Sequence, residues 1–200
     1  MPSAQTVLFV RAPRRGTVKT RLARTLGDDD ALTAYRTLLS TTCEALRELK
    51  PIELRFTPDD AAPELNEWLQ TGWTTAPQGS GNLGERLASA TQDHFQNDAS
   101  SVVIIGSDCP EITAADIQNA HQALATADVV LGPASDGGYW LIGLRRPTVG
   151  VFDNIAWSTE AVLQQTLERA AALGLSVATL RQLDDIDTHD DWLRWVGRKV

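Results

Sequence analysis

The sequence predicts an α/β protein in which a mainly parallel β-sheet carries helices on both faces. Short runs of apolar, β-branched residues such as Thr6–Val10 and Ser101–Gly106 are typical of strands buried on both faces of a parallel sheet. Segments with apolar residues at helical spacing lie between these runs, so strands and helices alternate. No internal repeat, low-complexity segment or linker interrupts residues 1–200, which we expect to form one domain.

The first half of the chain is expected to contain three strands and four helices, the last of which should reach about Phe95. A helix should start near Val18, after the Thr6–Val10 strand has been broken by proline and glycine. Pro51 should end the long helix that follows, because proline cannot continue a helix. The remaining predicted elements are a helix capped by Asp28–Asp30 and running to about Lys50, a strand at Ile52–Phe56, a short helix at Ala61–Leu69 and a strand at Trp73–Ala76.

The second half begins with Ser101–Gly106, the clearest buried strand in the chain. Thr113, with Asp116 three residues later, forms a capping box that should start the next helix. The remaining predicted elements are strands at Val129–Gly132 and Trp140–Leu144, a helix at Glu160–Leu173 capped by Ser158 or Thr159, a strand at Leu175–Leu180, and an amphipathic helix after Asp184–Thr188.

Composition limits the kinds of protein that this chain can be. A hydrophobic content of 42% and a length of 200 residues are ordinary for a soluble globular domain. No apolar run approaches the roughly 20 residues of a membrane-spanning helix, and the N-terminus lacks the features of a signal peptide. Two cysteines cannot form a disulfide framework. We therefore expect a reduced, cytoplasmic protein.

A cationic loop follows the first strand. Six basic side chains and no acidic ones lie between residues 11 and 24, although the chain has a formal net charge of −8. This concentration of charge is best explained by one anionic ligand, with phosphate the obvious candidate. Lys19 and Arg21 lie at the junction of loop and helix, where α/β sheets bind ligands. The alternative is a solvated surface, which could apply to Arg14, Arg15 and Arg24.

A second loop is rich in glycine. Gly79, Gly81 and Gly84 precede a helix that should reach about Phe95, and they would let the backbone approach a ligand closely. The alternative is a flexible loop followed by a helix that a capping box starts, with Asn82 as the N-cap and Glu85 as its partner.

Aspartates follow several of the strands or lie in loops. Asp108 comes directly after the strand Ser101–Gly106, at the end where such sheets bind ligands. Asp136 lies between two strands, and Asp185 and Asp187 precede the last helix. Asp108, with one late aspartate, could hold Mg²⁺ or Mn²⁺ together with substrate phosphates. The alternatives are a turn at Asp108, a hairpin turn at Asp136, and a simple helix cap at Asp187 and Thr188, with Asp191 three residues after Thr188.

Several other functions have little support in the sequence. The basic residues form one short loop and not an extended face, and the pI is near 4.8, so nucleic acid is not an expected partner. The three histidines lack zinc-site spacing, and neither a Walker-type P-loop nor a nucleophile elbow is present. Of the six tryptophans, Trp140 and Trp157 lie beside polar loops and could flank a ligand.

Five stretches taken together give the chain a family resemblance. It resembles DUF2064, a bacterial family of GT-A-like transferases often labelled glycosyltransferases, over nearly its whole length. The stretches are FVRAPRRGTVKTRLA (Phe9–Ala23), QGSGNLGERL (Gln78–Leu87), GSDCP (Gly106–Pro110), GPASDGGYWLIGL (Gly132–Leu144) with FDNIAWST (Phe152–Thr159), and DDIDTHDDW (Asp184–Trp192).

The resemblance implies a three-layer α/β/α, Rossmann-like GT-A fold, the nucleotide-diphospho-sugar transferase fold, with a mainly parallel mixed sheet. It also implies a relationship to nucleotidyltransferases of molybdenum-cofactor and deazaflavin (phospholactate) synthesis. In such folds the first loop meets the phosphates, the aspartate of GSDCP binds the divalent ion, and the late DxD-like segment can add a ligand. Asn82 stands where an aspartate would be expected, so Gly81 and Gly84 are left to admit a base by backbone contact.

We therefore expect a metal-dependent glycosyltransferase that moves a sugar from a nucleotide-diphosphate donor to a small acceptor. The phosphate ligands would be Arg11, Gly16, Lys19 and Arg21, and the metal ligands Asp108 and Asp187. The sugar or acceptor would face Asp136 as base, with Gly137, Gly138, Tyr139 and Trp157. The alternatives are a nucleotidyltransferase, which joins an NTP to a phosphorylated acceptor and releases pyrophosphate, and a nucleotide-binding module without catalysis.

Overall fold

Seven strands form one sheet at the centre of the chain in the computed structural model, which describes residues 3–198. The strand order is β3-β2-β1-β4-β6-β5-β7. All neighbouring strands pair in parallel except at β6, which is antiparallel to both β4 and β5. The strands are β1 Ala4–Arg11, β2 Ile52–Thr57, β3 Trp73–Pro77, β4 Ser101–Gly106, β5 Val129–Pro133, β6 Tyr139–Leu144 and β7 Val177–Thr179.

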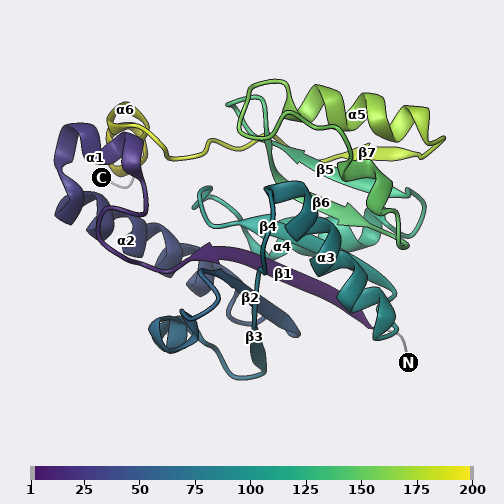
Figure 1. The fold of residues 1–200 in the computed structure, drawn as a ribbon, viewed down its shortest axis with the longest axis horizontal. Coiled ribbons are helices and arrows are strands. Elements are labelled where there is room, and N and C mark those ends of the chain that lie inside the picture. The colour runs from purple at the N-terminus through teal and green to yellow at the C-terminus, as the bar shows by residue number, and fades with distance from the viewer. Residues whose placement is uncertain (1–2, 199–200) are drawn as a thin grey trace.

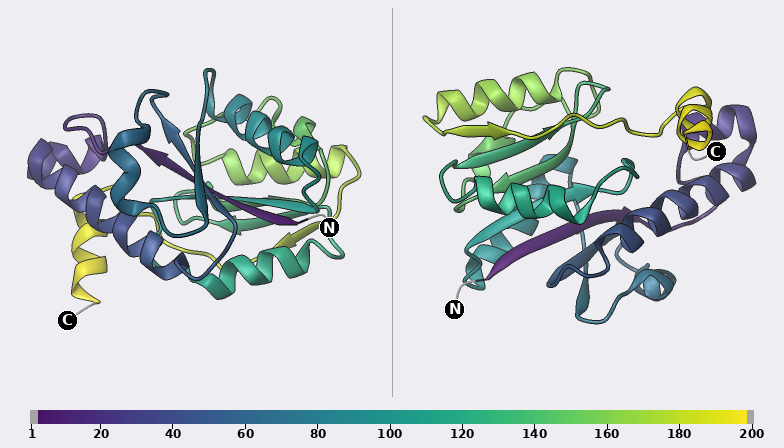
Figure 2. Two further views of the ribbon diagram at one scale, coloured as in Figure 1. Left: turned by 90° about the horizontal axis from the view of Figure 1, so that it is seen from below. Right: turned by 180° about the vertical axis from the view of Figure 1, so that it is seen from behind.

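Helices cover both faces of this sheet, as Figures 1 and 2 show. Leu8 and Val10 of β1 pack in the core cluster that contains side chains of α2 and α4, whereas Val7 and Phe9 pack in the cluster of α3 and α5. Successive side chains of a strand point to opposite faces, so one apolar run supplies both cores. The helices are α1 Thr20–Leu26, α2 Asp28–Leu46, α3 Leu83–Gln96, α4 Ala114–Ala123, α5 Val162–Ala172 and α6 His189–Gly197, with short 3₁₀ turns at Ala62–Trp68 and Val149–Phe152.

The C-terminal segment crosses from the β7 edge of the sheet to its centre. After β7, the chain runs along the end of β5, where Leu183 donates a backbone hydrogen bond to Pro133, and then crosses to the end of β4. It finishes in α6, which lies beside α1 (Figure 1). Trp195 of α6 is buried in a small cluster with Leu38 of α2 and Ile186. Residues far apart in sequence therefore meet beyond the carboxyl ends of β1 and β4.

Two predicted helix starts are wrong. The aspartates Asp28–Asp30 lie in the first turn of α2 and do not cap it, because the N-cap position is taken by Gly27. Carboxylates in a first turn still favour the helix through its dipole. Helix α5 starts at Val162, two residues later than predicted, because Thr159 forms a local turn with Ala156 instead of capping the helix. No helix within residues 3–198 is both long and apolar enough to cross a bilayer.

Candidate active site

Lys19 joins two of the predicted aspartates. Its Nζ atom lies 2.5 Å from Asp108 Oδ1 and 3.0 Å from Asp187 Oδ1. The Lys19 side chain is only 3% exposed, whereas that of Asp108 is 50% exposed. Burial lowers the pKa of Lys19, but the two carboxylates raise it by more than burial lowers it. The pKa of Lys19 therefore lies above its ordinary value. Lys19 is therefore a buried cation held by two carboxylates that reach towards solvent.

Three elements bring these residues together. Lys19 is the N-cap of α1 and has left-handed backbone angles, φ 47° and ψ 45°. Asp108 lies two residues after Gly106, the carboxyl end of β4, at the edge of the sheet that the sequence predicts. Asp187 precedes α6, and its neighbour Ile186 donates a 2.9 Å backbone hydrogen bond to the carbonyl of Asp108. The backbone of the late acidic segment is thus fixed against the loop that follows β4.

The capping box of α6 leaves Asp187 available for the site. Thr188 and Asp191 make the reciprocal hydrogen bonds of the capping box. The Asp187 backbone N–H also points at Asp191 Oδ2, at 3.3 Å, while the Asp187 carboxylate turns to Lys19 and, at 3.5 Å, to Arg21. The segment therefore starts a helix and also presents a carboxylate, so the two interpretations of the sequence do not exclude each other.

Some of the other basic residues in the cationic loop form ion pairs, and others are exposed to solvent. Arg14 pairs with Asp60 and Glu64, and Arg15 with Asp28 and Asp29. Arg11, at the end of β1, is exposed and has no ion-pair partner among residues 3–198. Arg24, in the last turn of α1, is likewise exposed and without an ion-pair partner among the described residues. Arg11, Arg24 and the largely exposed Arg21 are therefore the cations of this loop that an added anion could reach directly.

Tyr35 of α2 contributes to the site without any signal in the sequence. Its hydroxyl donates to the backbone carbonyl of Arg11 and accepts from the Arg11 N–H, both at 2.9 Å. The last pair of the β1–β4 ladder joins Phe9 to Gly106, so Tyr35 supplies hydrogen bonds to Arg11 beyond the end of that ladder. Burial, with a smaller contribution from Asp108, raises the pKa of Tyr35 to about 12, so the hydroxyl keeps its proton. A tyrosine on a helical face gives no sign of this role in sequence.

Asp136 and Asp185 belong to the same acidic group. Burial, and then the negative charges of Asp136 and Asp187, raises the pKa of Asp185 to about 6. Asp185 has no ion-pair partner among the described residues. Asp136 is exposed, and its Oδ1 accepts a 2.8 Å hydrogen bond from the Gly138 N–H within its own turn. The turn interpretation of Asp136 is therefore confirmed, although its second oxygen makes no hydrogen bond there.

The neighbours of Asp136 pack against α5 and against the residues that precede it. A Cβ atom at Gly137, where φ is +89°, would collide with the backbone of Glu160, and the Gly137 carbonyl accepts from Leu163 N at 2.9 Å. Tyr139 places its ring edge-on to Trp157, with ring centres 6.4 Å apart. Burial raises the pKa of the Tyr139 hydroxyl, which lies by Thr166 of α5. Gly137 and Tyr139 thus have structural contacts of their own, and their substrate roles stay predictions.

Gly84 and Trp157 meet in a second place. A Cβ atom at Gly84 would lie 2.6 Å from Trp157 Nε1, so the indole ring fits only because residue 84 is glycine. Both residues line a hollow of about 510 Å³, here called the α3 hollow, with the capping pair Asn82 and Glu85. Gly81 is held nearby, since its carbonyl accepts from Arg86 Nε at 2.9 Å. No hydrogen bond or ion pair of the described residues joins this hollow directly to Lys19.

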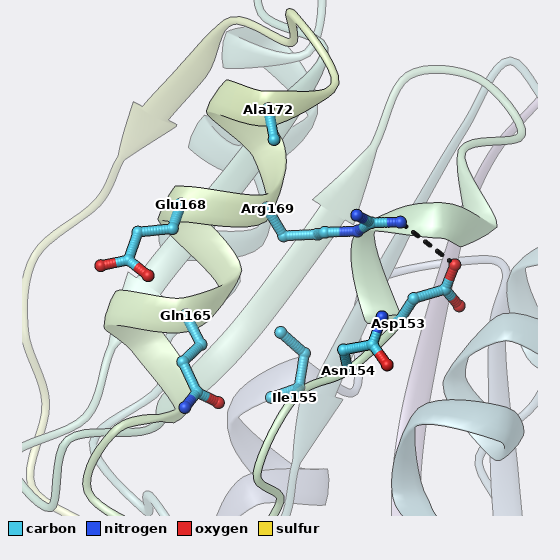
Figure 3. A pocket seen from close by; sticks show the side chains of 7 residues that line it. All are labelled: Asp153, Asn154, Ile155, Gln165, Glu168, Arg169 and Ala172. Atoms are coloured by element: carbon cyan, nitrogen blue, oxygen red, sulfur yellow. Dashed lines mark hydrogen bonds and ion pairs between the residues drawn. The ribbon is translucent and has the colours of Figure 1, made fainter.

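Another hollow, of about 360 Å³, lies between α5 and residues 153–155 (Figure 3). Arg169 crosses it to reach Asp153 at 3.4 Å, as the dashed line shows, and Arg169 Nε also donates to the Gly150 carbonyl. None of its lining residues was predicted to be functional. Because its one well-placed cation is already paired, this hollow is a weaker candidate than the group around Lys19.

The chemistry of Asp108 and Asp187 fits a divalent ion. Across residues 3–198, no group of three or more His, Cys, Asp or Glu side chains is arranged to hold a metal. The two predicted ligands nevertheless converge on one cation, the Lys19 ammonium. Carboxylate oxygens are the donors that Mg²⁺ prefers, and one or two of them commonly suffice when substrate phosphates complete the shell. The donor set is therefore suited to an ion shared with a phosphate ligand.

Comparison with known proteins relates this geometry to a family. A family model described as an uncharacterized protein conserved in bacteria, DUF2064, matches residues 36–159. That region contains Asp108 and Asp136, whereas Lys19 and Asp187 lie outside it. A search of curated proteins gives no match.

Solved structures extend the likeness to the whole chain. One from Desulfovibrio desulfuricans G20, provisionally described as a nucleotide-diphospho-sugar transferase, is 34% identical, with a TM-score of 0.91, over 100% of this chain and 88% of that chain. The Rv0371c protein of Mycobacterium tuberculosis H37Rv, solved with manganese, is 16% identical over 98% of both chains, with a TM-score of 0.56. A CMP:2-keto-3-deoxy-manno-octonic acid synthetase complexed with CTP is 10% identical over 99% of this chain and 100% of that chain, with a TM-score of 0.60. The last two share the fold, and the predicted α/β fold class is confirmed.

Proposed function

The chain belongs to the bacterial family DUF2064, and we propose that it is a metal-dependent glycosyltransferase acting on a nucleotide-diphosphate sugar and a small acceptor. One observation carries the proposal: Lys19, from the cationic loop, lies between Asp108 and Asp187 beyond the carboxyl ends of β1 and β4. This is the end of an open α/β sheet at which ligands bind. The 34% identity with a protein described as a sugar transferase supports the class of reaction.

Arg11, Lys19 and Arg21 are the proposed ligands of the donor diphosphate. Arg11 and Arg21 are exposed and can bind the outer oxygens, and Lys19 adds a cation from inside the protein. Tyr35 fixes the backbone of Arg11, which orients the start of this loop. Cations already positioned around the leaving group stabilise the charge that develops as the sugar–phosphate bond breaks.

Asp108 and Asp187 are the proposed ligands of Mg²⁺ or Mn²⁺. A bound divalent ion would neutralise part of the charge on the departing diphosphate. The two carboxylates also have a second role, since one oxygen of each holds Lys19 in its place until the donor arrives.

Asp136 is the proposed base for the acceptor hydroxyl. One of its oxygens is fixed by the Gly138 N–H, which leaves the other to accept a proton. Gly137 and Tyr139 hold this turn against α5, and Gly138 bonds to Asp136 and Ala134 within the turn. The α3 hollow, with Gly81 beside it and Gly84 and Trp157 in its wall, is the proposed place for the base or another part of the substrate.

The products of the reaction test the proposal. With a panel of nucleotide sugars, Mn²⁺ and candidate acceptors, we expect release of a nucleoside diphosphate. Release of pyrophosphate from an NTP would identify a nucleotidyltransferase instead, because that reaction keeps the nucleotide joined to its acceptor. Nucleotide binding without any turnover would leave a binding module and contradict the proposed catalysis.

The variant Asp108→Asn tests the site. It keeps the size of the side chain but removes the charge, and we expect turnover to fall by about 10² or more, as when a main electrostatic stabiliser is lost. Asp60→Asn is a matched control, since Asp60 is an exposed carboxylate paired with Arg14 of the same cationic loop. Steady-state rates should be close to wild type for that control. Equal rates for wild type and Asp108→Asn would refute the assigned role.

A further inference from the structure

Lys19 occupies the position that the proposed divalent ion needs. Its Nζ atom is within 3.0 Å of one oxygen from each carboxylate, Asp108 and Asp187. A divalent ion bound to the same oxygens would lie at about 2.0–2.1 Å from each. An ammonium group and a metal ion cannot share that space, because two cations at such a distance repel strongly in a partly buried site.

Among the described residues, Lys19 has no ion-pair partner other than Asp108 and Asp187. Its ammonium hydrogen bonds go to Asp108 and Asp187, and its side chain is 3% exposed. Arg21 is 61% exposed, so it can keep or leave Asp187 without being desolvated. Lys19 must therefore exchange one set of negative oxygens for another if it moves, and the phosphates of a donor are the oxygens within the proposed site.

We infer that Lys19 is an internal counter-ion that holds the metal position closed until a nucleotide diphosphate draws it away, so that metal and nucleotide bind cooperatively. The inference rests on the proposed function for the identity of the two ligands. Lys19 then stabilises the metal-free carboxylates and later the donor phosphates. The same residue makes metal binding weak without nucleotide and strong with it.

Thermodynamic linkage makes this coupling measurable. If nucleotide raises the affinity for Mn²⁺ by some factor, Mn²⁺ must raise the affinity for nucleotide by the same factor. Removing the Lys19 charge should abolish most of this coupling, because the carboxylates would then be open to a metal at all times. It should also weaken nucleotide binding, since one phosphate ligand is lost.

Titrations with Mn²⁺ alone test the inference directly. By paramagnetic resonance of free Mn²⁺, without nucleotide, we expect Lys19→Met to bind the ion at least about tenfold more tightly than wild type, the effect of removing one adjacent cation. Arg15→Met is the matched control: it removes a charge from the same loop, but Arg15 pairs with Asp28 and Asp29. That control should bind Mn²⁺ as wild type does. Equal affinities for wild type and Lys19→Met would overturn the inference.

The double variant Lys19→Met with Asp108→Asn locates the metal. It should lose the tight binding gained in Lys19→Met, because only one of the two carboxylates remains. If it still binds Mn²⁺ as tightly as Lys19→Met, the ion lies elsewhere and the inference is wrong.

Amine labelling tests the wild-type protein without any substitution. The chain has three lysines, and acetylation followed by peptide mass spectrometry separates Lys19 from the exposed Lys50. Lys19 should react more slowly than Lys50 in metal-free protein and faster once Mn²⁺ saturates the site, with Lys50 unchanged. If the reactivity of Lys19 is the same with and without saturating Mn²⁺, Lys19 does not leave the two carboxylates when the metal binds, and the inference is wrong.

Failure of the inference and failure of the proposed function give different results. If nucleotide sugars bind with Mn²⁺ but Lys19→Met shows unchanged coupling, the function stands and the counter-ion role falls. If no nucleotide binds while Lys19→Met still gains affinity for Mn²⁺, the exclusion of metal by Lys19 is supported and the proposed function falls.

Discussion

The ammonium group of Lys19 lies inside the protein and not in solvent. A lysine at a loop and helix junction is ordinarily a flexible, hydrated cation. Here a left-handed N-cap conformation and two carboxylates hold it, and the net effect raises its pKa above the ordinary value. It therefore stays charged across the physiological range, which a phosphate ligand or a counter-ion requires.

Gly84 shows how a single missing side chain shapes the α3 hollow. We expect Gly84→Ala to lower the free energy of unfolding by about 1–3 kcal/mol, since the new Cβ would lie 2.6 Å from Trp157 Nε1 and force the ring to move. Urea denaturation measures this change.

Gly197→Ala is the matched control for that substitution. Gly197 is also a helical glycine, in α6, but a Cβ there would meet nothing within 4 Å. It should leave the free energy of unfolding unchanged or raise it by up to about 1 kcal/mol through helix propensity. A Gly84→Ala protein as stable as wild type would show that the ring moves without cost.

Helix caps are the elements that local sequence determines best. The capping boxes at Asn82–Glu85, Thr113–Asp116 and Thr188–Asp191 are all confirmed. Each joins residues three positions apart, so its geometry depends little on the rest of the fold. Asp116 shows the limit of this independence, because its carboxylate also pairs with Arg181, which is 65 residues away along the chain.

His121 links three elements and gives a prediction about pH. Its ring, on α4, lies 3.1 Å from Thr6 Oγ1 of β1 and 2.9 Å from Ser101 Oγ of β4. Burial lowers the pKa of His121 below its ordinary value of 6.5. The unfolded chain therefore binds a proton more readily than the folded protein, and stability from this residue is lost as the pH falls below that value.

His121→Gln removes this titration. Between pH 7.5 and pH 5 we expect the wild type to lose more free energy of unfolding than the variant, as measured by urea denaturation at each pH. His94 and His189 remain in both proteins, so their contributions cancel in the comparison. If the two proteins lose the same free energy of unfolding between these pH values, burial of His121 does not lower its pKa.

At the scale of the whole molecule, the site depends on the path of the C-terminal segment. The segment crosses from the end of β5 to the end of β4 and brings Asp187 to Lys19, which lies 168 residues earlier in the chain. The net charge of −8 would repel a nucleotide in general. The cations of the first loop therefore have to overcome the field of the rest of the protein.

Ligand binding should stabilise the whole molecule. A nucleotide sugar with Mn²⁺ at 100 times its dissociation constant contributes about 2.7 kcal/mol by mass action. For a chain of this size, that corresponds to a rise in Tm of roughly 5–10 °C. A thermal-shift screen with and without Mn²⁺ measures it, and Asp108→Asn should lose the part that depends on the metal. No shift with any nucleotide would contradict the proposed function.

Local sequence patterns are enough to predict the alternation of strands and helices, the parallel core strands and most helix starts, because apolar periodicity and capping act over a few residues. They also mark Lys19, Arg21, Asp108 and Asp187 as candidates. The folded molecule was needed to show that Lys19 lies between Asp108 and Asp187, that Tyr35 holds Arg11, and that Trp157 fills the space beside Gly84. Those contacts join residues far apart in sequence, and no local pattern encodes a distance that exists only after the sheet has formed.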